Sequence, residues 1–218
     1  MRVVIAGGHG KIALLLERLL AERGDQAVGL IRNPAHVADV QKAGAEAVIC
    51  DLEAASAEDV EVLLSGADAV VFAAGAGAGS GAPRKDSVDR GASVLMADAA
   101  ERAGVRRFVQ VSSMGTGQPP RPGTDEVWAA YITAKTAAED DLHARDLDWT
   151  ILRPGRLTDA PPTGGIRLAP PPVPRDTVSR ADVAAVIAAL LDNPGTRHQT
   201  LELVGGDTPV ATAVHSIS

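Results

Sequence analysis

Short apolar runs rich in valine, isoleucine and alanine alternate with longer amphipathic stretches along most of the chain. The short runs have the length of buried strands, while the longer stretches repeat apolar residues every three or four positions, as one face of a helix does. Strands are therefore expected at 2–7, 27–32, 46–51, 68–75, 106–113, 148–155 and 200–206. Helices are expected at 11–24, 34–44, 56–66, 84–104, 125–145 and 179–193.

Residues that favour helix ends stand at several of these boundaries. Ser56 and Ser179 each precede a helix and are followed three positions later by Asp59 and Asp182, a pattern similar to a capping box. Gly24 follows the first helix, where glycine commonly ends one. These residues support the helix boundaries independently of the apolar pattern.

The expected strands are apolar at nearly every position rather than at alternate positions. Such strands need cover on both faces, which is typical of a parallel sheet. Repeated strand–helix units then imply right-handed crossovers and an α/β fold with a doubly wound, mostly parallel sheet. With 218 residues, the chain is expected to form one domain over 1–218.

Most of the prolines collect at 156–178, where the alternation breaks. Proline lacks the N–H group that a strand ladder needs, so neither a regular helix nor a central strand is expected there. A flexible linker is one alternative, but a helix and a strand follow. The segment is therefore expected to be an ordered loop or small subdomain over the carboxyl edge of the sheet, on the substrate side.

The first strand and helix are joined by AGGHGKIA, with Gly7 and Gly10 three positions apart and Ala13 three further on. Glycine permits a sharp turn and lets a pyrophosphate approach the N–H groups at the start of the helix, where Lys11 and Ile12 stand. An ordinary tight turn is the alternative. The place of this loop, at the first strand–helix junction and before a strongly periodic helix, favours a dinucleotide site.

The end of the second strand carries Arg32 and Asn33 and no carboxylate. NAD sites usually place an acidic residue there, on the ribose 2′-hydroxyl, whereas a guanidinium suits the 2′-phosphate of NADP. A solvated surface arginine is the alternative interpretation. The position favours NADP(H) over NAD(H) as the cofactor.

Two further strand ends are expected to border the adenosine. Asp51, followed by Leu52, ends the third strand and is placed to accept a hydrogen bond from the adenine amino group. Ala74 and Gly75 belong to the sequence FAAGAGAG after the fourth strand, which lets backbone run beside the adenosine. Both segments can also be interpreted as ordinary turns.

Composition and charge exclude several other functions. The formal net charge of −7 disfavours a nucleic-acid surface, and no apolar run reaches the roughly 18 residues of a membrane helix. The chain begins on a strand that enters the glycine loop, so no signal sequence is expected. A single cysteine, Cys50, cannot form an internal disulfide, which favours a cytoplasmic location. His9 has no partner at ligand spacing, so no metal site is expected.

The only tyrosine of the chain, Tyr131, stands four residues before Lys135, one of four lysines. On the expected helix, this spacing puts both on one face. A lysine ammonium beside a phenol favours the phenolate, and such a tyrosine can donate a proton to a carbonyl as hydride arrives. Ser112 and Ser113 end the fifth strand, where ligands bind in such sheets. An incidental pair on an amphipathic helix is the alternative.

The motifs together resemble those of short-chain dehydrogenase/reductases. GGHGKIA, IRNP, CDL, VVFAAG, AGVRRFVQVSSMG, YITAK and WTILRPGRLTD occur in the expected order, and they are most similar to the compact atypical members, NAD(P)H-binding or NmrA-like. The resemblance implies a Rossmann-type three-layer fold and a nicotinamide cofactor. It also implies catalytic roles for Ser113 (or Ser112), Tyr131 and Lys135, of which Lys135 also contacts the nicotinamide ribose.

The residues and the resemblance together assign one set to the cofactor site. These cofactor-binding residues are Gly7, Gly10, Lys11, Ile12, Arg32, Asn33, Asp51, Leu52, Ala74, Gly75, Ser112, Lys135, Pro154 and Gly155. One departure from the family concerns catalysis: its active members often carry an asparagine on the helix before the fifth strand, and this chain has Asp89 there. The departure puts turnover in question but not cofactor binding.

Three functions fit these observations. The first is an NADP(H)-dependent oxidoreductase that transfers hydride between nicotinamide and a small carbonyl or related acceptor. The second is an NADP(H)-sensing regulator that acts through a protein partner, and the third is epimerase or dehydratase chemistry. A homodimer is compatible with all three.

The acceptor does not follow from the sequence. Its pocket is expected under 156–178 and beside 112–123, where Trp128 would supply an aromatic wall. The positive charges in these segments are Arg121, Arg156, Arg167 and Arg175. They suit an anionic substrate, with solvated loop arginines as the alternative.

Overall fold

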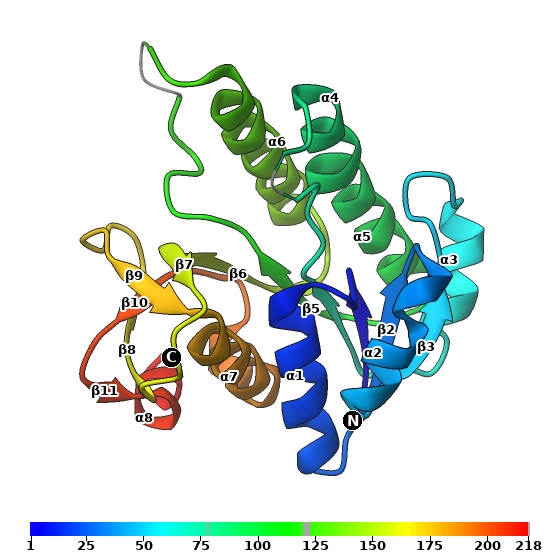
Figure 1. Cartoon of the computed structure of the whole chain (residues 1–218), viewed down its shortest axis with the longest axis horizontal. Coiled ribbons are helices and arrows are strands. Elements are labelled where there is room, and N and C mark those ends of the chain that lie inside the picture. The colour runs from blue at the N-terminus through cyan, green and yellow to red at the C-terminus, as the bar shows by residue number, and fades with distance from the viewer. Residues whose placement is uncertain (78, 120–122, 218) are drawn as a thin grey trace.

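The computed structural model describes residues 1–77, 79–119 and 123–217. Within these residues, nine strands form one mixed sheet in the order β11-β8-β10-β6-β5-β4-β1-β2-β3 (Figure 1). The parallel strands are β1 (Arg2–Ala6), β2 (Gln26–Ile31), β3 (Glu46–Ile49), β4 (Ala69–Phe72), β5 (Arg107–Val111), β6 (Asp148–Pro154) and β10 (Gln199–Gly205). Their order runs outward in both directions from β1 and β4, so the sheet is doubly wound, as predicted.

Two layers of helices cover the sheet (Figure 1). One layer comprises α1 (Lys11–Glu22), α2 (Val37–Lys42), α7 (Arg180–Asp192) and α8 (Val210–His215). The other comprises α3 (Ala57–Leu64), α5 (Ala92–Arg102) and α6 (Glu126–His143). The strand β1 is apolar throughout because Val3 and Ile5 pack into the core under the first layer, while Val4 and Ala6 pack under the second. The expected three-layer α/β fold is confirmed.

The helix ends follow the capping residues of the sequence. Ser56 Oγ accepts a hydrogen bond from the Asp59 N–H at 3.2 Å, and Asp59 Oδ2 accepts one from the Ser56 N–H at 3.0 Å. Ser179 Oγ likewise accepts from the Asp182 N–H at 2.9 Å. Both predicted caps are therefore present. Two short 3₁₀ turns, Pro34–His36 and Pro194–Thr196, flank α2 and α7.

The helix predicted at 84–104 is divided into segments. It begins as α4 (Ala82–Arg84), widens into a π-helical stretch at Lys85–Gly91 and continues as α5. The π-helical stretch packs against α6 and buries the side chains of Lys85 and Asp89. Stretches of π-helix are frequent at functional sites, because the wider turn redirects side chains.

The proline-rich segment corrects one prediction, because it supplies strands. The strand β7 (Arg156–Thr158) pairs in parallel with β9 (Thr177–Ser179), as a small separate sheet. Between them, β8 (Gly165–Ala169) enters the main sheet, antiparallel to β10 on one side and to β11 (Thr208–Pro209) on the other. The prediction of no central strand was wrong here, since the prolines flank a five-residue run that contains none. That run alternates correctly for a strand, with Ile166 and Leu168 buried.

Candidate active site

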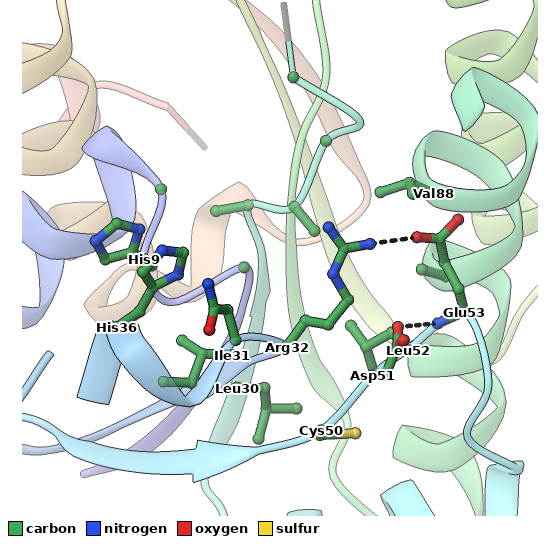
Figure 2. A pocket seen from close by; sticks show the side chains of 18 of the residues that line it. His9, Leu30, Ile31, Arg32, His36, Cys50, Asp51, Leu52, Glu53 and Val88 are labelled. Atoms are coloured by element: carbon green, nitrogen blue, oxygen red, sulfur yellow. Dashed lines mark hydrogen bonds and ion pairs between the residues drawn. The ribbon is translucent and has the colours of Figure 1, made fainter. Parts of the chain in front are cut away.

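Two adjoining pockets lie at the carboxyl edge of the parallel strands. The arginine pocket, of about 540 Å³, lies beyond β1, β2 and β3 and contains Arg32 (Figure 2). Arg84 also lines it. The tyrosine pocket, of about 930 Å³, lies beyond β5 and β6 and contains Tyr131. Residues 73–75 and Gly77, which follow β4, line both. The pockets therefore meet where the strand order reverses, which is the usual ligand site of such sheets.

Most of the residues assigned from the sequence line one of these pockets. Those in the arginine pocket are Gly7, Gly10, Arg32, Asn33, Asp51, Leu52, Ala74 and Gly75. Those in the tyrosine pocket are Ile12, Ala74, Gly75, Ser112, Ser113, Tyr131, Lys135, Pro154 and Gly155. The exception is Lys11, whose Nζ points to Asp159 Oδ2 at 2.6 Å on the exposed side of α1.

The glycine loop is shaped by close backbone packing. Gly7 has a φ of +78°, and a Cβ placed on it would lie 2.7 Å from the Ala74 Cα. Gly10 closes the turn by donating its N–H to the Gly7 carbonyl at 2.8 Å. Sequence reasoning missed Gly8, at which a Cβ would lie 2.6 Å from the Gly29 Cα in β2. The loop thus has room only for glycine at two successive positions, and the Gly-Gly pair itself was the available signal.

A shared carboxylate organises the arginine pocket. Glu53 Oε2 accepts hydrogen bonds from Arg32 Nη1 at 2.9 Å and from Arg84 Nη2 at 2.7 Å, and Glu53 Oε1 accepts from Ser87 Oγ at 2.7 Å. The hydrogen bond from Arg84, together with that from Ser87, lowers the pKa of the Glu53 carboxyl group. Two guanidinium groups therefore share one carboxylate, and Asp51 is the second acidic residue that lines the pocket. Figure 2 shows the Arg32–Glu53 contact.

Neighbouring side chains of the arginine pocket are held by local contacts. Asp51 Oδ1 accepts the Glu53 N–H at 3.1 Å (Figure 2). His9 of the glycine loop stacks on His36, with 3.6 Å between ring centroids, and its Nε2 lies 2.9 Å from Asp39 Oδ2. Within the described residues, no group of three or more potential metal ligands occurs. Sequence reasoning missed His36, Arg84 and Glu53, because their meeting depends on the fold.

Tyr131 and Lys135 share one face of α6 and both line the tyrosine pocket. Lys135 is buried, and its Nζ lies 5.9 Å from the centroid of the Tyr131 ring. The ammonium donates a hydrogen bond to the Val111 carbonyl at 3.0 Å and lies 3.3 Å from Asp89 Oδ1. Asp89 also accepts the Ala76 N–H at 3.2 Å. The aspartate at the expected asparagine position is therefore a direct neighbour of the lysine.

The two serines after β5 have different surroundings. Ser112 is buried and donates its hydroxyl hydrogen bond to the Glu139 carboxylate. Glu139 is in turn paired with Arg153, whose Nε donates to Glu139 Oε1 at 3.1 Å. Among the described residues, the Ser113 Oγ has one polar contact, to the Met114 carbonyl at 3.4 Å. The hydroxyl of Ser112 is therefore committed to the protein, whereas that of Ser113 is available to a ligand.

The substrate-side residues are only partly assembled at the tyrosine pocket. Arg156 and Arg175 line it, whereas Arg167 is exposed on β8 and Arg121 lies outside the described residues. Trp128 also lines it, 46% exposed, with its ring centroid 5.2 Å from that of Tyr131. An aromatic wall beside the tyrosine is therefore present.

A comparison with protein families and known proteins agrees with this geometry. The sequence model of the NAD(P)H-binding family matches residues 7–194. The chain belongs to this NAD(P)H-binding family. A Bacillus subtilis protein with the name uncharacterized sugar epimerase YhfK is 34% identical over the whole of both chains.

Solved structures of similar proteins share the fold. A putative NAD-dependent epimerase/dehydratase from Bacillus halodurans is 36% identical, with a TM-score of 0.90 over 99% of each chain. The oxidoreductase ylbE from Lactococcus lactis is 27% identical, with a TM-score of 0.87 over 100% of this chain and 96% of that one. ChuY, an anaerobillin reductase from Escherichia coli O157:H7, is 26% identical, with a TM-score of 0.80 over 95% and 98%. One of these names is that of a putative NAD-dependent epimerase/dehydratase, and the other two are those of an oxidoreductase and a reductase.

The residues of this NAD(P)H-binding protein fit a dinucleotide. The N-terminus of α1 has no side-chain cap and no acidic residue in its first turn, so its N–H groups are open to an anion. The turn at Gly7 leaves no room for a side chain between it and Ala74, as a loop that must approach a ligand with its backbone requires. No helix of the described part is long and apolar enough to cross a membrane.

Proposed function

We propose that the chain is an NADP(H)-dependent oxidoreductase acting on a small carbonyl or related acceptor, with Tyr131 as the proton donor. The observation that carries the proposal is that Tyr131, Lys135 and Ser113 line one pocket, which shares a wall with the arginine pocket. A cofactor bound across both pockets would bring its reactive end to the tyrosine.

Different residues of the chain would contact different parts of the cofactor. The glycine loop and the uncapped start of α1 would receive the pyrophosphate, and Arg32 with Arg84 would receive the 2′-phosphate. Asp51 and Leu52 would border the adenine, while Pro154 and Gly155 would border the nicotinamide. When bound, NADP(H) supplies or accepts the hydride.

Around the acceptor, three side chains have separate roles. Ser113 orients the acceptor by donating a hydrogen bond from its hydroxyl group to the carbonyl oxygen. As the hydride adds to the carbonyl carbon, the Tyr131 Oη transfers its proton to the same oxygen, so that the carbonyl becomes an alcohol. Lys135, fixed by Val111 and Asp89, keeps positive charge beside the phenol as negative charge develops on it.

Asp89 favours one competing function. Its carboxylate lies 3.3 Å from Lys135 Nζ and partly neutralises the charge that the proton transfer needs. A chain that binds NADP(H) but transfers hydride slowly would suit a sensor that acts through a protein partner.

NADPH oxidation by the purified protein tests the proposal. The absorbance of NADPH is followed with a panel of aldehydes, ketones, quinones and flavins, and a nucleotide sugar is included to detect epimerisation. We expect oxidation with at least one carbonyl or quinone. Tight NADPH binding without oxidation by any acceptor would instead support the sensor, and interconversion of the sugar would support an epimerase.

A second prediction concerns the choice of cofactor. Arg32→Ala should weaken NADPH binding by roughly tenfold or more and leave NADH binding nearly unchanged, because a charge-assisted hydrogen bond to the 2′-phosphate is lost. Glu53→Gln should strengthen NADPH binding, because it removes the carboxylate that competes for the guanidinium groups. Fluorescence titration with both nucleotides measures the two effects.

Arg18→Ala, on the exposed side of α1, is the matched control. Tighter NADH than NADPH binding by the wild type would remove the role given to Arg32.

A further inference from the structure

A second lysine lies beside the tyrosine ring. Lys85, in the π-helical stretch, is only 8% exposed and lines the tyrosine pocket. Its Nζ lies 5.4 Å from the centroid of the Tyr131 ring and donates a hydrogen bond to the Gly77 carbonyl at 2.9 Å. No carboxylate of the described residues lies within salt-bridge distance of this ammonium, whereas Lys135 next to it has Asp89. An ammonium has three donors, so two remain without a protein acceptor among the described residues.

A buried ammonium without a counter-ion is unfavourable unless something compensates its charge. The backbone carbonyl of Gly77 offers one neutral acceptor and no negative charge. A ligand anion in the pocket would supply the negative charge that the protein does not place beside Lys85. The burial of Lys85 therefore points to a charged ligand rather than to a structural ion pair.

The remaining charges of the tyrosine pocket point in the same direction. Its cationic lining residues are Lys85, Lys135, Arg156, Arg175 and Arg180, and its acidic ones are Asp89, Asp125 and Asp176. Each acid is engaged by the protein: Asp89 by Lys135, Asp125 by the Trp128 N–H and Asp176 by the Thr177 N–H. Arg180 is paired with Asp159. In a chain of net charge −7, a pocket with this excess of cations is an exception.

We infer that the acceptor bound in the tyrosine pocket carries a carboxylate, which Lys85 holds while the reducible carbonyl faces Tyr131. The inference rests on the proposed function, since it takes this pocket as the acceptor site. A carboxylate suits the buried end better than a phosphate does, because only one of its two ammonium groups, that of Lys85, has no counter-ion among the described residues, and the arginines of the pocket lie at its rim. Arg156 and Arg175, both exposed at the rim, draw the anion toward the pocket.

Equilibrium binding of matched probes tests this inference without turnover. The probes are the 3- and 4-isomers of acetylbenzoate and their neutral counterparts, the acetylbenzamides, titrated with and without NADP⁺ by calorimetry. The wild type should bind at least one acetylbenzoate about tenfold more tightly than its amide. Lys85→Gln should remove this preference, and Lys85→Arg should restore part of it. Lys42→Gln, an exposed lysine of α2, is the matched control and should change nothing.

The outcomes separate this inference from the proposed function. The affinity of Lys85→Gln for NADP⁺ and its unfolding midpoint show whether the variant keeps its fold. Equal binding of acid and amide by the wild type, or a preference that persists in a folded Lys85→Gln, would overturn the inference. If the preference depends on Lys85 but no acceptor oxidises NADPH, the carboxylate site at Lys85 stands and the oxidoreductase proposal fails. If neutral carbonyls are reduced and a carboxylate brings no advantage, only the inference fails.

Discussion

Phenylalanine in place of Tyr131 is expected to lower kcat by about 10²- to 10⁴-fold, the usual contribution of a general acid. Within the described residues, this side chain contacts Trp128, Lys85 and Lys135 through its ring. Phenylalanine keeps that ring, so the fold and the affinity for NADPH should change little. The variant therefore removes the proton donor and little else.

Stopped-flow and steady-state NADPH oxidation with the best acceptor measure the effect. Thr133→Ala, on the exposed side of the same helix, is the control for changes in α6 and should keep wild-type kcat. An unchanged kcat in Tyr131→Phe, under conditions where chemistry limits the rate, would show that the proton comes from another source. A raised KM with unchanged kcat would give the tyrosine a binding role only.

Glutamine in place of Glu17 is expected to stabilise the protein at neutral and alkaline pH. Glu17 is fully buried on α1, and neither carboxyl oxygen has a partner within the described residues. It lies under the glycine loop: a Cβ on Gly29 would approach Glu17 Oε1 to 2.6 Å, and one on Gly8 to 3.0 Å. Burial raises the pKa of Glu17 from 4.5 to about 8. An ionised carboxylate is therefore unfavourable in this position.

The direction of the pH dependence follows from these two values. Below pH 4.5, Glu17 is protonated in the folded and the unfolded chain, and its contribution to stability is fully present. Between pH 4.5 and about 8, the unfolded chain loses the proton while the folded chain keeps it, so stability falls as pH rises. At about 1.4 kcal/mol per pKa unit, the loss at pH 7 reaches up to about 3 kcal/mol. Glutamine carries no such proton and removes this loss.

Urea unfolding at pH 5 and pH 8 measures the prediction. Wild type and Glu17→Gln should differ little at pH 5, and the variant should be clearly more stable at pH 8. Glu22→Gln, at an exposed position of the same helix, should have the stability of the wild type at pH 5 and at pH 8. If the free energy of unfolding changed equally with pH in wild type and Glu17→Gln, the Glu17 carboxyl group would not titrate between pH 5 and pH 8.

Sequence reasoning recovered the parallel sheet because its strands are short, uniformly apolar and separated by periodic helices. It failed where a rule based on local sequence did not hold in the folded chain. The proline rule was applied to all of 156–178, but the prolines bracket β8 without entering it. The π-helical stretch at Lys85–Gly91 was missed because the apolar pattern of 84–104 predicts a helix without distinguishing its hydrogen-bond pattern.

The candidate site was predictable where one motif carries its residues. Tyr131 and Lys135 are one helical turn apart, and the spacing alone places them together. The contact of Asp89 with Lys135 joins two helices, and only a family resemblance pointed to its position. Glu53 and Lys85 were missed because their importance arises from partners that are far away in the sequence or missing. A charge without a counter-ion cannot be recognised before the fold is known.

The pairing of β7 with β9 has a consequence for how such a protein can diversify. It brings Arg156 opposite Thr177, so the chain leaves the pocket rim and returns to it at one place. Between β7 and β9, the strand β8 pairs with β10, so the segment 159–176 is also held by the main sheet. Insertions at 159–164 or 170–176 would therefore form closed loops whose anchors stay fixed, and lengthening a closed loop adds little entropy cost. The shape of the pocket rim can thus change while the parallel strands below keep their register.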